Sequence, residues 1–306
     1  MRTLGIRCLI LLAFGLANGA LAAERCDCDS EVRPRIEAYD ALLTFTAGQK
    51  TSLEKKHLAW GRPIPPVGAT REHLLHVKDY LIWHDDDLRI PLWVSYKLTK
   101  SNLAASRERL ECFRPDPRLP TDAAGTCDDY DEETFDRGHM VPNSDMERSE
   151  AAMLNTYLFS NMTPQHIRFN RGIWQRLEGM VRDWVRTGGT LYAITGVVFD
   201  KDSDGTRDAD SSANRVSPLN RVGIPSHYYK IIVKKRAFKA PETIAILLPH
   251  NNEKQPNGQF RDYLTGHITT IDEIEAVTGI DFFPTLSAAK ESVLESSKAP
   301  ALWATN

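Results

Sequence analysis

Three short segments in the middle of the chain carry its most informative pattern. They are Asp136-Arg137-Gly138-His139-Met140, then Ser160-Asn161-Met162-Thr163-Pro164-Gln165, and then Asn170-Arg171-Gly172-Ile173-Trp174, which continues through Arg176-Leu177-Glu178. A histidine next to an arginine suits a general base beside a phosphate clamp. Taken singly, each feature has a simpler structural explanation: a core histidine, an asparagine helix cap, and a surface ion pair between Glu178 and Arg182.

The third segment opens the clearest helix of the sequence, expected from Arg171 to Arg186. Placed at 100° per residue, its large apolar residues fall on one side, with Glu178 and Arg182 at the border of that side. Gly188-Gly189 is a typical helix end. The apolar set comprises Ile173, Trp174, Leu177, Met180, Val181, Trp184 and Val185.

The remaining pattern mixes strands and helices without strict alternation, which favours an α+β fold. Residues 113–135 form a long acidic loop with three prolines. Two further helices are expected at Ser149–Ser160 and Thr270–Thr278, the second opened by Thr270, and a last one at Leu286–Ser296. Strand composition marks Leu74–Val77, Pro91–Leu98, Thr190–Val198, His227–Val233 and Thr243–Leu248.

Together, the three ordered segments resemble the DNA/RNA non-specific endonuclease family, over roughly residues 70–285 of this chain. The resemblance implies a mixed or antiparallel sheet core with a ββα-metal active-site motif and flanking helices. It also implies Mg²⁺-dependent hydrolysis of DNA and RNA, with Mn²⁺ as an alternative ion, to 5′-phosphate products. Contacts would be to the nucleic-acid backbone, and a homodimer is an open option.

The resemblance also implies roles for individual residues. His139 matches the general base, Asn170 the single direct protein ligand of the metal, and Glu178 the acid that orients metal-bound waters. Arg137 and Arg182 match arginines near the phosphate, and Arg109 is the nearest candidate for a further upstream arginine. These roles suit the chemistry, because Mg²⁺ keeps several waters and needs few protein ligands.

The N-terminus reads as an export signal. Arg2 and Arg7 precede an apolar run, and Ala20-Leu21-Ala22 fits the small-residue cleavage rule, so residues 1–22 are expected to be a signal peptide. An uncleaved anchor is the alternative. We expect a periplasmic or secreted protein that does not associate with the membrane after cleavage. Its parts would be an irregular lead-in at 23–66 with a short helix, a nuclease domain at 67–285 and a C-terminal tail at 286–306.

Export bears on the four cysteines that remain after residue 22. Cys26 and Cys28 are too close to pair with each other, and Cys112–Cys127 is the best local candidate for a disulfide. A metal site is the rival interpretation, but no Cys-x-x-Cys pair or nearby histidine supports it.

The charge of the chain gives no direct support for binding a polyanion. The 306 residues carry 38 Lys and Arg against 41 Asp and Glu, and removing residues 1–22 leaves 36 against 41, a net charge of −5. The composition, 42% hydrophobic and 26% charged, excludes collagen-like and wholly disordered chains. Basic residues do gather at 166–186 and 228–239, where either run is a phosphate-tracking groove or simply a solvated face.

A second metal signal lies further along the chain. Asp200, Asp202, Asp204 and Gly205, with Asp208 at the ninth position, resemble the start of a calcium loop. Ser211 stands where the bidentate Glu is needed, so a solvated acidic loop is the alternative to a structural Ca²⁺ site.

Two alternatives to a nuclease remain open at this point. One is a catalytically silent nucleic-acid-binding protein with the same fold, against which the intact His139, Asn170 and Glu178 set counts. The other is a phosphodiesterase for smaller nucleotides.

Overall fold

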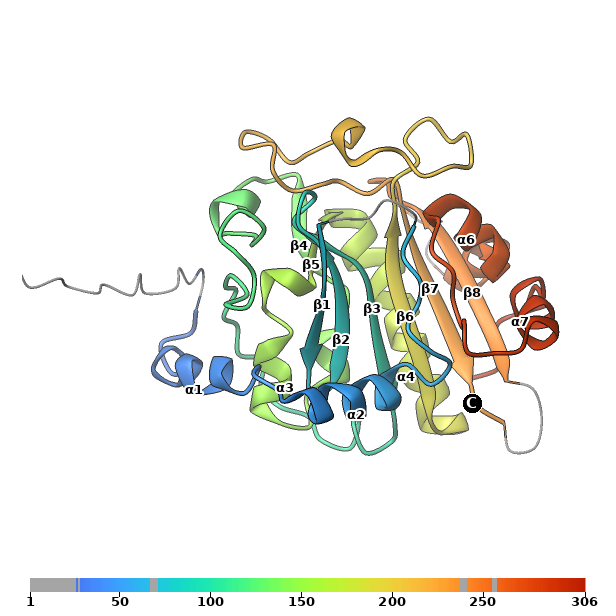
Figure 1. Ribbon diagram of the computed structural model, residues 1–306, viewed down its shortest axis with the longest axis horizontal. Coiled ribbons are helices and arrows are strands. Elements are labelled where there is room, and N and C mark those ends of the chain that lie inside the picture. The colour runs from blue at the N-terminus through green and yellow to red at the C-terminus, as the bar shows by residue number, and fades with distance from the viewer. Residues whose placement is uncertain (1–25, 27, 67–70, 237–240, 255–257, 306) are drawn as a thin grey trace, which may run out of the picture.

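Antiparallel strands form the core of the computed structural model, which describes residues 26, 28–66, 71–236, 241–254 and 258–305 (Figure 1). The predicted signal peptide lies outside these residues. A seven-stranded sheet has the order β1-β2-β3-β6-β7-β8-β9, and β4 and β5 form a separate pair. The strands are β1 (Glu72–Val77), β2 (Tyr80–Asp85), β3 (Ile90–Leu98), β4 (Phe135–His139), β5 (Met162–His166), β6 (Leu191–Val198), β7 (His227–Lys234), β8 (Glu242–Pro249) and β9 (Ile268–Thr269).

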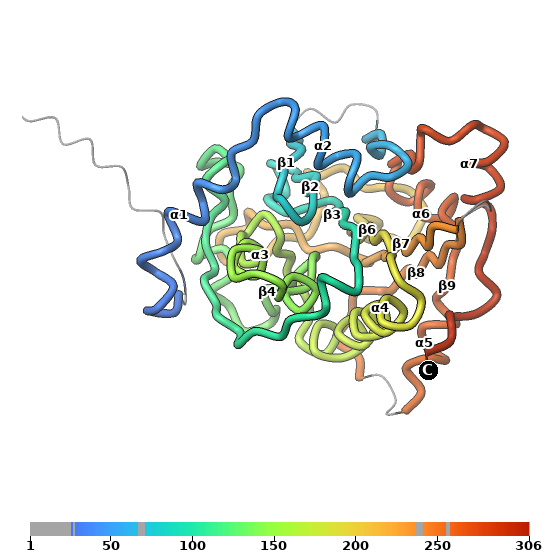
Figure 2. The backbone as a smooth tube through the Cα atoms, turned by 90° about the horizontal axis from the view of Figure 1, so that it is seen from below, coloured from blue at the N-terminus to red at the C-terminus, as the bar shows by residue number. Residues whose placement is uncertain are grey.

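Helices cover this sheet on both faces, which Figure 2 shows with α2 and α4 on opposite sides. The expected α+β class is confirmed. Short 3₁₀ turns are η1 (Arg33–Arg35), η2 (Asp128–Tyr130), η3 (Asn143–Asp145), η4 (Phe159–Asn161) and η6 (Asp210–Ser212). The longer helices are α1 (Ile36–Ala41), α2 (Ala47–His57), α3 (Glu150–Asn155), α4 (Gln175–Gly188), α5 (Phe260–Gly266), α6 (Ile271–Thr278) and α7 (Ala288–Glu295), with a π-helical segment, η5, at Phe169–Trp174.

Alternation along β3 decides which layer each side chain meets, because successive side chains point to opposite faces of a sheet. The Ser95 hydroxyl donates to the backbone oxygen of His57 at the end of α2 (2.9 Å). The next residue, Tyr96, points to the other face and donates to buried Asp145 (2.9 Å). Arg182 of helix α4 also donates to Asp145, so α4 lies on the sheet face to which Tyr96 points.

Two expected helices differ from the structure at one end. The helix expected from Arg171 begins as α4 at Gln175, because Gly172 has non-helical backbone angles (φ −112°, ψ −107°) inside the π-helical segment. Its end is confirmed: Gly189 follows Gly188 with φ +93°. The helix expected over Ser149–Ser160 stops at Asn155, because Leu158 and Phe159 leave it to pair with Arg114.

The lead-in before residue 67 packs on the sheet. Helix α2 begins with a reciprocal capping box between Thr46 and Gln49, the arrangement that a Thr-x-x-Gln sequence permits. His57 at its other end accepts the backbone N–H of Lys97 on β3 through Nδ1 (3.2 Å). Leu43 and Leu58 belong to the main hydrophobic core.

The predicted Cys112–Cys127 disulfide is wrong. The structure pairs Cys26 with Cys127 and Cys28 with Cys112, across sequence separations of 101 and 84 residues. The reason is a β-bridge between Cys26 and Phe113, which lays the N-terminal segment alongside residues 112 and 113. Both N-terminal cysteines therefore lie next to cysteines that are distant in the sequence. In the described residues, no helix is long and apolar enough to cross a membrane.

Candidate active site

His139 ends β4, and the antiparallel partner β5 fixes its position. Asp136, Arg137, Gly138 and His139 pair in register with Gln165, Pro164, Thr163 and Met162. Gly138 is required by close packing, since a Cβ atom there would lie 2.2 Å from Cδ of Gln165. The second sequence segment, which contains Gln165, thus forms the strand that supports the histidine.

The half-buried ring of His139 lies among aromatic side chains. Its centroid is 5.0 Å from that of Tyr157 and 6.1 Å from that of Phe113, both in edge-on geometry. Nε2 is shielded from solvent and has no hydrogen-bond partner among the described residues. Burial, and after it the charge of Arg109, lowers the pKa of His139 to about 3. The ring is therefore neutral at physiological pH.

Two arginines lie over the same pair of aromatic rings. Arg109 donates from Nε to the Tyr157 hydroxyl (2.9 Å) and forms an ion pair with Glu111. The guanidinium of Arg137 lies 5.0 Å from the centroid of Phe113. The structure thus brings Arg109 and Arg137 to the histidine, with Arg109 near enough to act on its pKa.

Asn170 lies in the π-helical segment that precedes α4, and its amide is oriented by Asp136. Nδ2 of Asn170 donates to Oδ2 of Asp136 (2.9 Å), and Arg171 holds the same carboxylate through Nε and Nη2 (2.9 and 2.6 Å). Because the amide nitrogen faces the carboxylate, the amide oxygen points away from it, and no described residue donates a hydrogen bond to that oxygen. Single-turn π segments inside helices are frequent at functional sites.

Glu178 lies one turn into α4, among buried charges. Burial is the main cause that raises its pKa, to about 7, while Lys230 and Arg182 oppose that shift. Arg182 donates to Asp145 (3.0 Å), a buried acid that is 37 residues away in the sequence. This acid, with 1% of its side chain exposed, lay outside the sequence-based set.

Lys230 is a second functional candidate, which the sequence analysis placed only in the basic run at 228–239. It is 1% exposed, donates from Nζ to the Thr195 hydroxyl (2.5 Å), and lies 4.8 Å from the ring centroid of Trp174. Burial lowers its pKa to about 8, with Glu178 and then Asp145 opposing. A charged residue inside an otherwise apolar strand, Tyr228–Val233, was the available signal. The basic run at 228–239 is thus not uniformly a surface feature.

The sequence model of the DNA/RNA non-specific endonucleases matches residues 65–289 of this chain, which include the ββα unit that carries His139 and Asn170. The chain belongs to the DNA/RNA non-specific endonuclease family. It is accordingly a nucleic-acid-hydrolysing enzyme.

Named relatives of this non-specific endonuclease include mitochondrial and fungal nucleases. Mitochondrial nuclease EXOG of Xenopus laevis is 29% identical over 280 residues, covering 90% of this chain and 74% of the relative. Nuclease C1 of Cunninghamella echinulata var. echinulata is 30% identical over 229 residues, covering 72% and 86%. Human mitochondrial nuclease EXOG is 28% identical over 217 residues, covering 70% of this chain and 57% of the relative.

Outside the ββα unit, the acidic loop of the endonuclease holds three converging carboxylates. Oxygens of Asp200, Asp202 and Asp204 lie within 4.8 Å of one another. Asp200 accepts the backbone N–H groups of Asp204 and Gly205 (3.0 and 3.1 Å). Asp208 lies outside this trio and accepts the N–H of Lys201 (2.7 Å). A Ca²⁺ ion in this loop stays a prediction.

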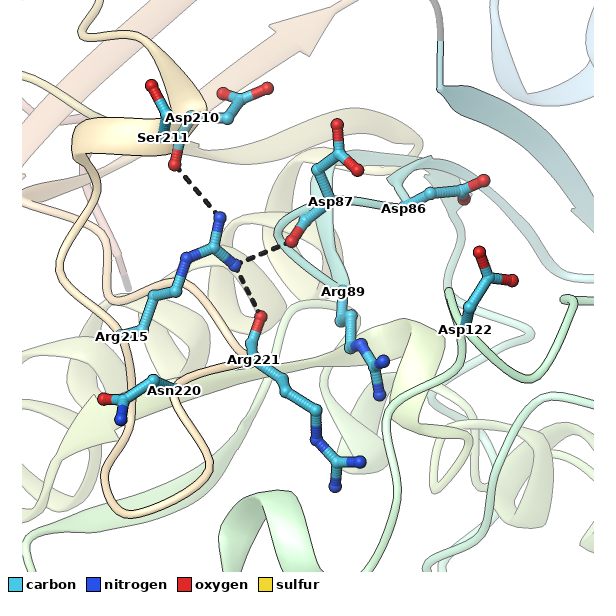
Figure 3. A pocket seen from close by; sticks show the side chains of 9 residues that line it. All are labelled: Asp86, Asp87, Arg89, Asp122, Asp210, Ser211, Arg215, Asn220 and Arg221. Carbon is cyan, nitrogen blue, oxygen red and sulfur yellow. Dashed lines mark hydrogen bonds between the residues drawn. The ribbon is translucent and has the colours of Figure 1, made fainter.

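A polar pocket of about 380 Å³ lies elsewhere on the endonuclease, lined by arginines and acids but by neither His139 nor Asn170 (Figure 3). Its arginines are occupied by protein groups. Arg215 donates to the backbone oxygens of Asp87, Asp210 and Arg221, and Arg221 donates to Asp129 (2.7 Å). This arrangement indicates a structural network that holds loops together.

Proposed function

We propose that this endonuclease is an exported, Mg²⁺-dependent enzyme that cleaves phosphodiester bonds of both DNA and RNA, leaving 5′-phosphates. The observation that carries the proposal is one ββα unit with two complementary features. His139 has an unpartnered, shielded ring nitrogen, and Asn170 has an amide oxygen turned away from Asp136. The first is a neutral imidazole nitrogen with no partner among the described residues, and the second is an amide oxygen, a hard ligand.

The donor set fits a hard divalent ion, since Asn170 offers an amide oxygen and Glu178 a carboxylate on the same helical unit. Asn170 would bind the ion directly, and Glu178 would orient its waters. When bound, such an ion stabilises the negative charge that develops on the phosphate. Mn²⁺ would serve in the same site.

The remaining chemistry falls to the chain itself. Nε2 of His139 accepts the proton of the attacking water, a step that needs the neutral ring. Arg137 and Arg109 supply positive charge beside that ring. Their guanidinium groups would pair with phosphate oxygens of the substrate. Arg182, predicted to lie near the phosphate, instead donates a hydrogen bond to Asp145. Its charge acts through Glu178.

Digestion assays test the proposal. Plasmid DNA and structured RNA would both be cleaved by the full mature chain with Mg²⁺, and EDTA would abolish cleavage. His139→Ala would reduce the rate at least about a hundredfold, as expected for loss of a general base. His73→Ala, which changes an exposed histidine on β1, is the matched control and would cleave like wild type. Undiminished cleavage by His139→Ala would refute the base assignment.

The two alternative functions give different results in the same assay. A catalytically silent binder would retain nucleic-acid binding and cleave nothing with Mg²⁺ or Mn²⁺. A small-nucleotide phosphodiesterase would hydrolyse a chromogenic diester faster than plasmid or RNA. For export, we expect N-terminal sequencing of the protein from the periplasm or medium to begin at Ala23; a retained Met1 would contradict a cleaved signal.

A further inference from the structure

Five carboxylates gather where α7 packs beside α6, far along the chain from the ββα unit. Asp272 and Glu275 belong to α6, Asp281 to the connecting loop, and Glu291 and Glu295 to α7. Oxygens of Asp272, Glu275 and Glu295 lie within 4.8 Å of one another, and so do those of Asp281, Glu291 and Glu295. Glu295 is therefore common to both trios.

Glu295 is the unusual member, because it is buried without a partner. The residue is only 5% exposed, and its Oε1 atom has no hydrogen bond to any described residue. A carboxylate oxygen shielded from water and left unpaired costs free energy that a cation or proton would recover. In each trio, a carboxylate oxygen of Glu295 lies within 4.8 Å of oxygens of the two other acids.

Among the residues that the structure describes, no basic side chain neutralises this cluster. Within the described parts of the chain, none of the five acids forms an ion pair with Lys, Arg or His. The groups that act most on Glu295 are acids, and burial together with Glu275 and Glu291 raises the pKa of Glu295 to about 8. Glu275 is positioned by the backbone N–H of Phe282, which donates to its Oε1 (2.7 Å) and leaves the second oxygen available.

We propose that these carboxylates form a binding site for a hard divalent cation of the calcium class, centred on Glu295. Ca²⁺ takes six to eight oxygen ligands in flexible geometry, whereas Mg²⁺ demands a small octahedral shell and keeps more of its water. Exposed Asp272 and Asp281 leave room for water at the open side of the site. The ion would tie α7 to α6 and so fix the C-terminal segment on the domain.

This site is separate from the catalytic unit. Phe282, next to Asp281, packs against Tyr229 (5.9 Å between centroids). Tyr229 points to the sheet face opposite Tyr228 and Lys230, which meet the β4–β5 pair and Trp174. A cation here would therefore stabilise the fold without contacting the substrate.

The test is thermal unfolding and calorimetric titration of the full mature chain, stripped with EDTA and then given Ca²⁺ alone. Wild type would show a rise in Tm with Ca²⁺, because binding to the folded state stabilises it. Glu295→Gln keeps the size of the side chain but removes the carboxylate ligand on which the site is centred. It would weaken this binding event at least tenfold.

Two further variants separate this site from other metal sites. Asp202→Asn/Asp204→Asn changes the loop at 200–208, and Asn170→Ala changes the proposed catalytic ligand; both would retain the Ca²⁺ binding event that Glu295→Gln loses. Asp272→Asn/Asp281→Asn alters exposed residues only, so it carries the test even where Glu295→Gln does not fold. The proposal is overturned if that double variant keeps the full Ca²⁺ shift, or if Mg²⁺ gives a larger shift than Ca²⁺.

Discussion

Asp136 supports two neighbouring side chains at once, and its importance is clear only in three dimensions. It receives the amide of Asn170 and the guanidinium of Arg171 from the segment after β5, although both are more than 30 residues away along the chain. The carboxylate thereby fixes which end of the Asn170 amide is free. In metal sites generally, groups that orient a ligand contribute about 10- to 100-fold to metal affinity or activity.

Asp136→Ala should therefore weaken the binding of Mg²⁺ without abolishing it. We expect the Mg²⁺ concentration for half-maximal cleavage to rise about 10- to 100-fold, in line with losses of outer partners at metal sites. Activity would recover in part at high Mg²⁺, which a purely unfolded protein would not show. Asp183→Ala is the matched control, since Asp183 is an exposed acid paired with Arg186. An unchanged Mg²⁺ dependence in Asp136→Ala would contradict the orienting role.

The β4–β5 pair is the element on which the histidine depends, and its close contact is at Gly138. Gly138→Ala places a methyl group against Gln165, so we expect a loss of about 1–3 kcal/mol in the free energy of unfolding. Cleavage should fall as well, because His139 is the next residue. Adding Gln165→Ala would relieve the clash and recover part of both losses.

Gly179→Ala provides the comparison within α4. The nearest atom to a Cβ at Gly179 is Nη2 of Arg182 at 3.8 Å, an ordinary contact. Alanine is favoured over glycine inside a helix, so this variant should be neutral or gain about 0.5–1 kcal/mol. Urea unfolding gives the free energy of unfolding of wild type, Gly138→Ala, Gly138→Ala/Gln165→Ala and Gly179→Ala. Equal stability of Gly138→Ala and Gly179→Ala would contradict the packing argument.

Helix α2 is held to the sheet by a buried neutral histidine, which makes its attachment sensitive to acid. Burial lowers the pKa of His57 to about 3, below its ordinary value near 6.5. As pH falls below 6.5, the unfolded chain gains a proton that the folded state rejects, so stability present above that pH is lost on acidification. At pH 4.5 this term is about 2.5 kcal/mol relative to pH 7.

Urea unfolding at pH 7 and pH 4.5 checks this term. Wild type should lose more stability between the two values than His57→Gln, which cannot bind the proton. Comparing the pH-dependent losses, rather than the absolute stabilities, removes the contribution of packing changed by the substitution. A loss as large in His57→Gln as in wild type would show that other groups carry the acid sensitivity.

Across the whole molecule, two disulfides close large loops around the lead-in. Peptide mapping without reduction should recover Cys26 linked to Cys127 and Cys28 linked to Cys112; a Cys112–Cys127 peptide would contradict the structure. Removing the second bridge with Cys28→Ser/Cys112→Ser should cost about 2–4 kcal/mol of stability. His139 itself should keep its environment, because β4, β5 and the Phe113–Tyr157 pair do not include either cysteine.

The charge balance is also settled at this scale. Three of the seven acids in the loop at 113–135 are ion-paired within the protein: Asp116 with Arg118, Asp129 with Arg221, and Asp122 with Arg71. Part of the negative charge of this loop is thus compensated locally, while Arg109 and Arg137 lie beside His139. A net charge of −3 over the full chain is compatible with a nucleic-acid substrate because placement, not the sum, sets the local field.

The sequence alone determined what depends on short-range pattern. Periodicity located most strands of the large sheet and the apolar face of α4, Thr270 marked the start of α6, and the ordered motifs identified the family. Strand β2 was not predicted, although Tyr80 to Trp83 form an apolar run. Its polar end, His84 and Asp85, is buried, and Asp86 and the Leu88 N–H supply hydrogen-bond partners there.

Only the tertiary structure decided which distant groups pair. The sequence allows several possible partners for each of these groups. The structure decides the disulfide pairing, the hydrogen bond from Arg182 to Asp145, the burial of Lys230 and the clustering of acids around Glu295. Cysteines, carboxylates and basic groups pair with whatever packing brings within reach. That choice is made by the three-dimensional arrangement of the sheet and its layers, which no local pattern records.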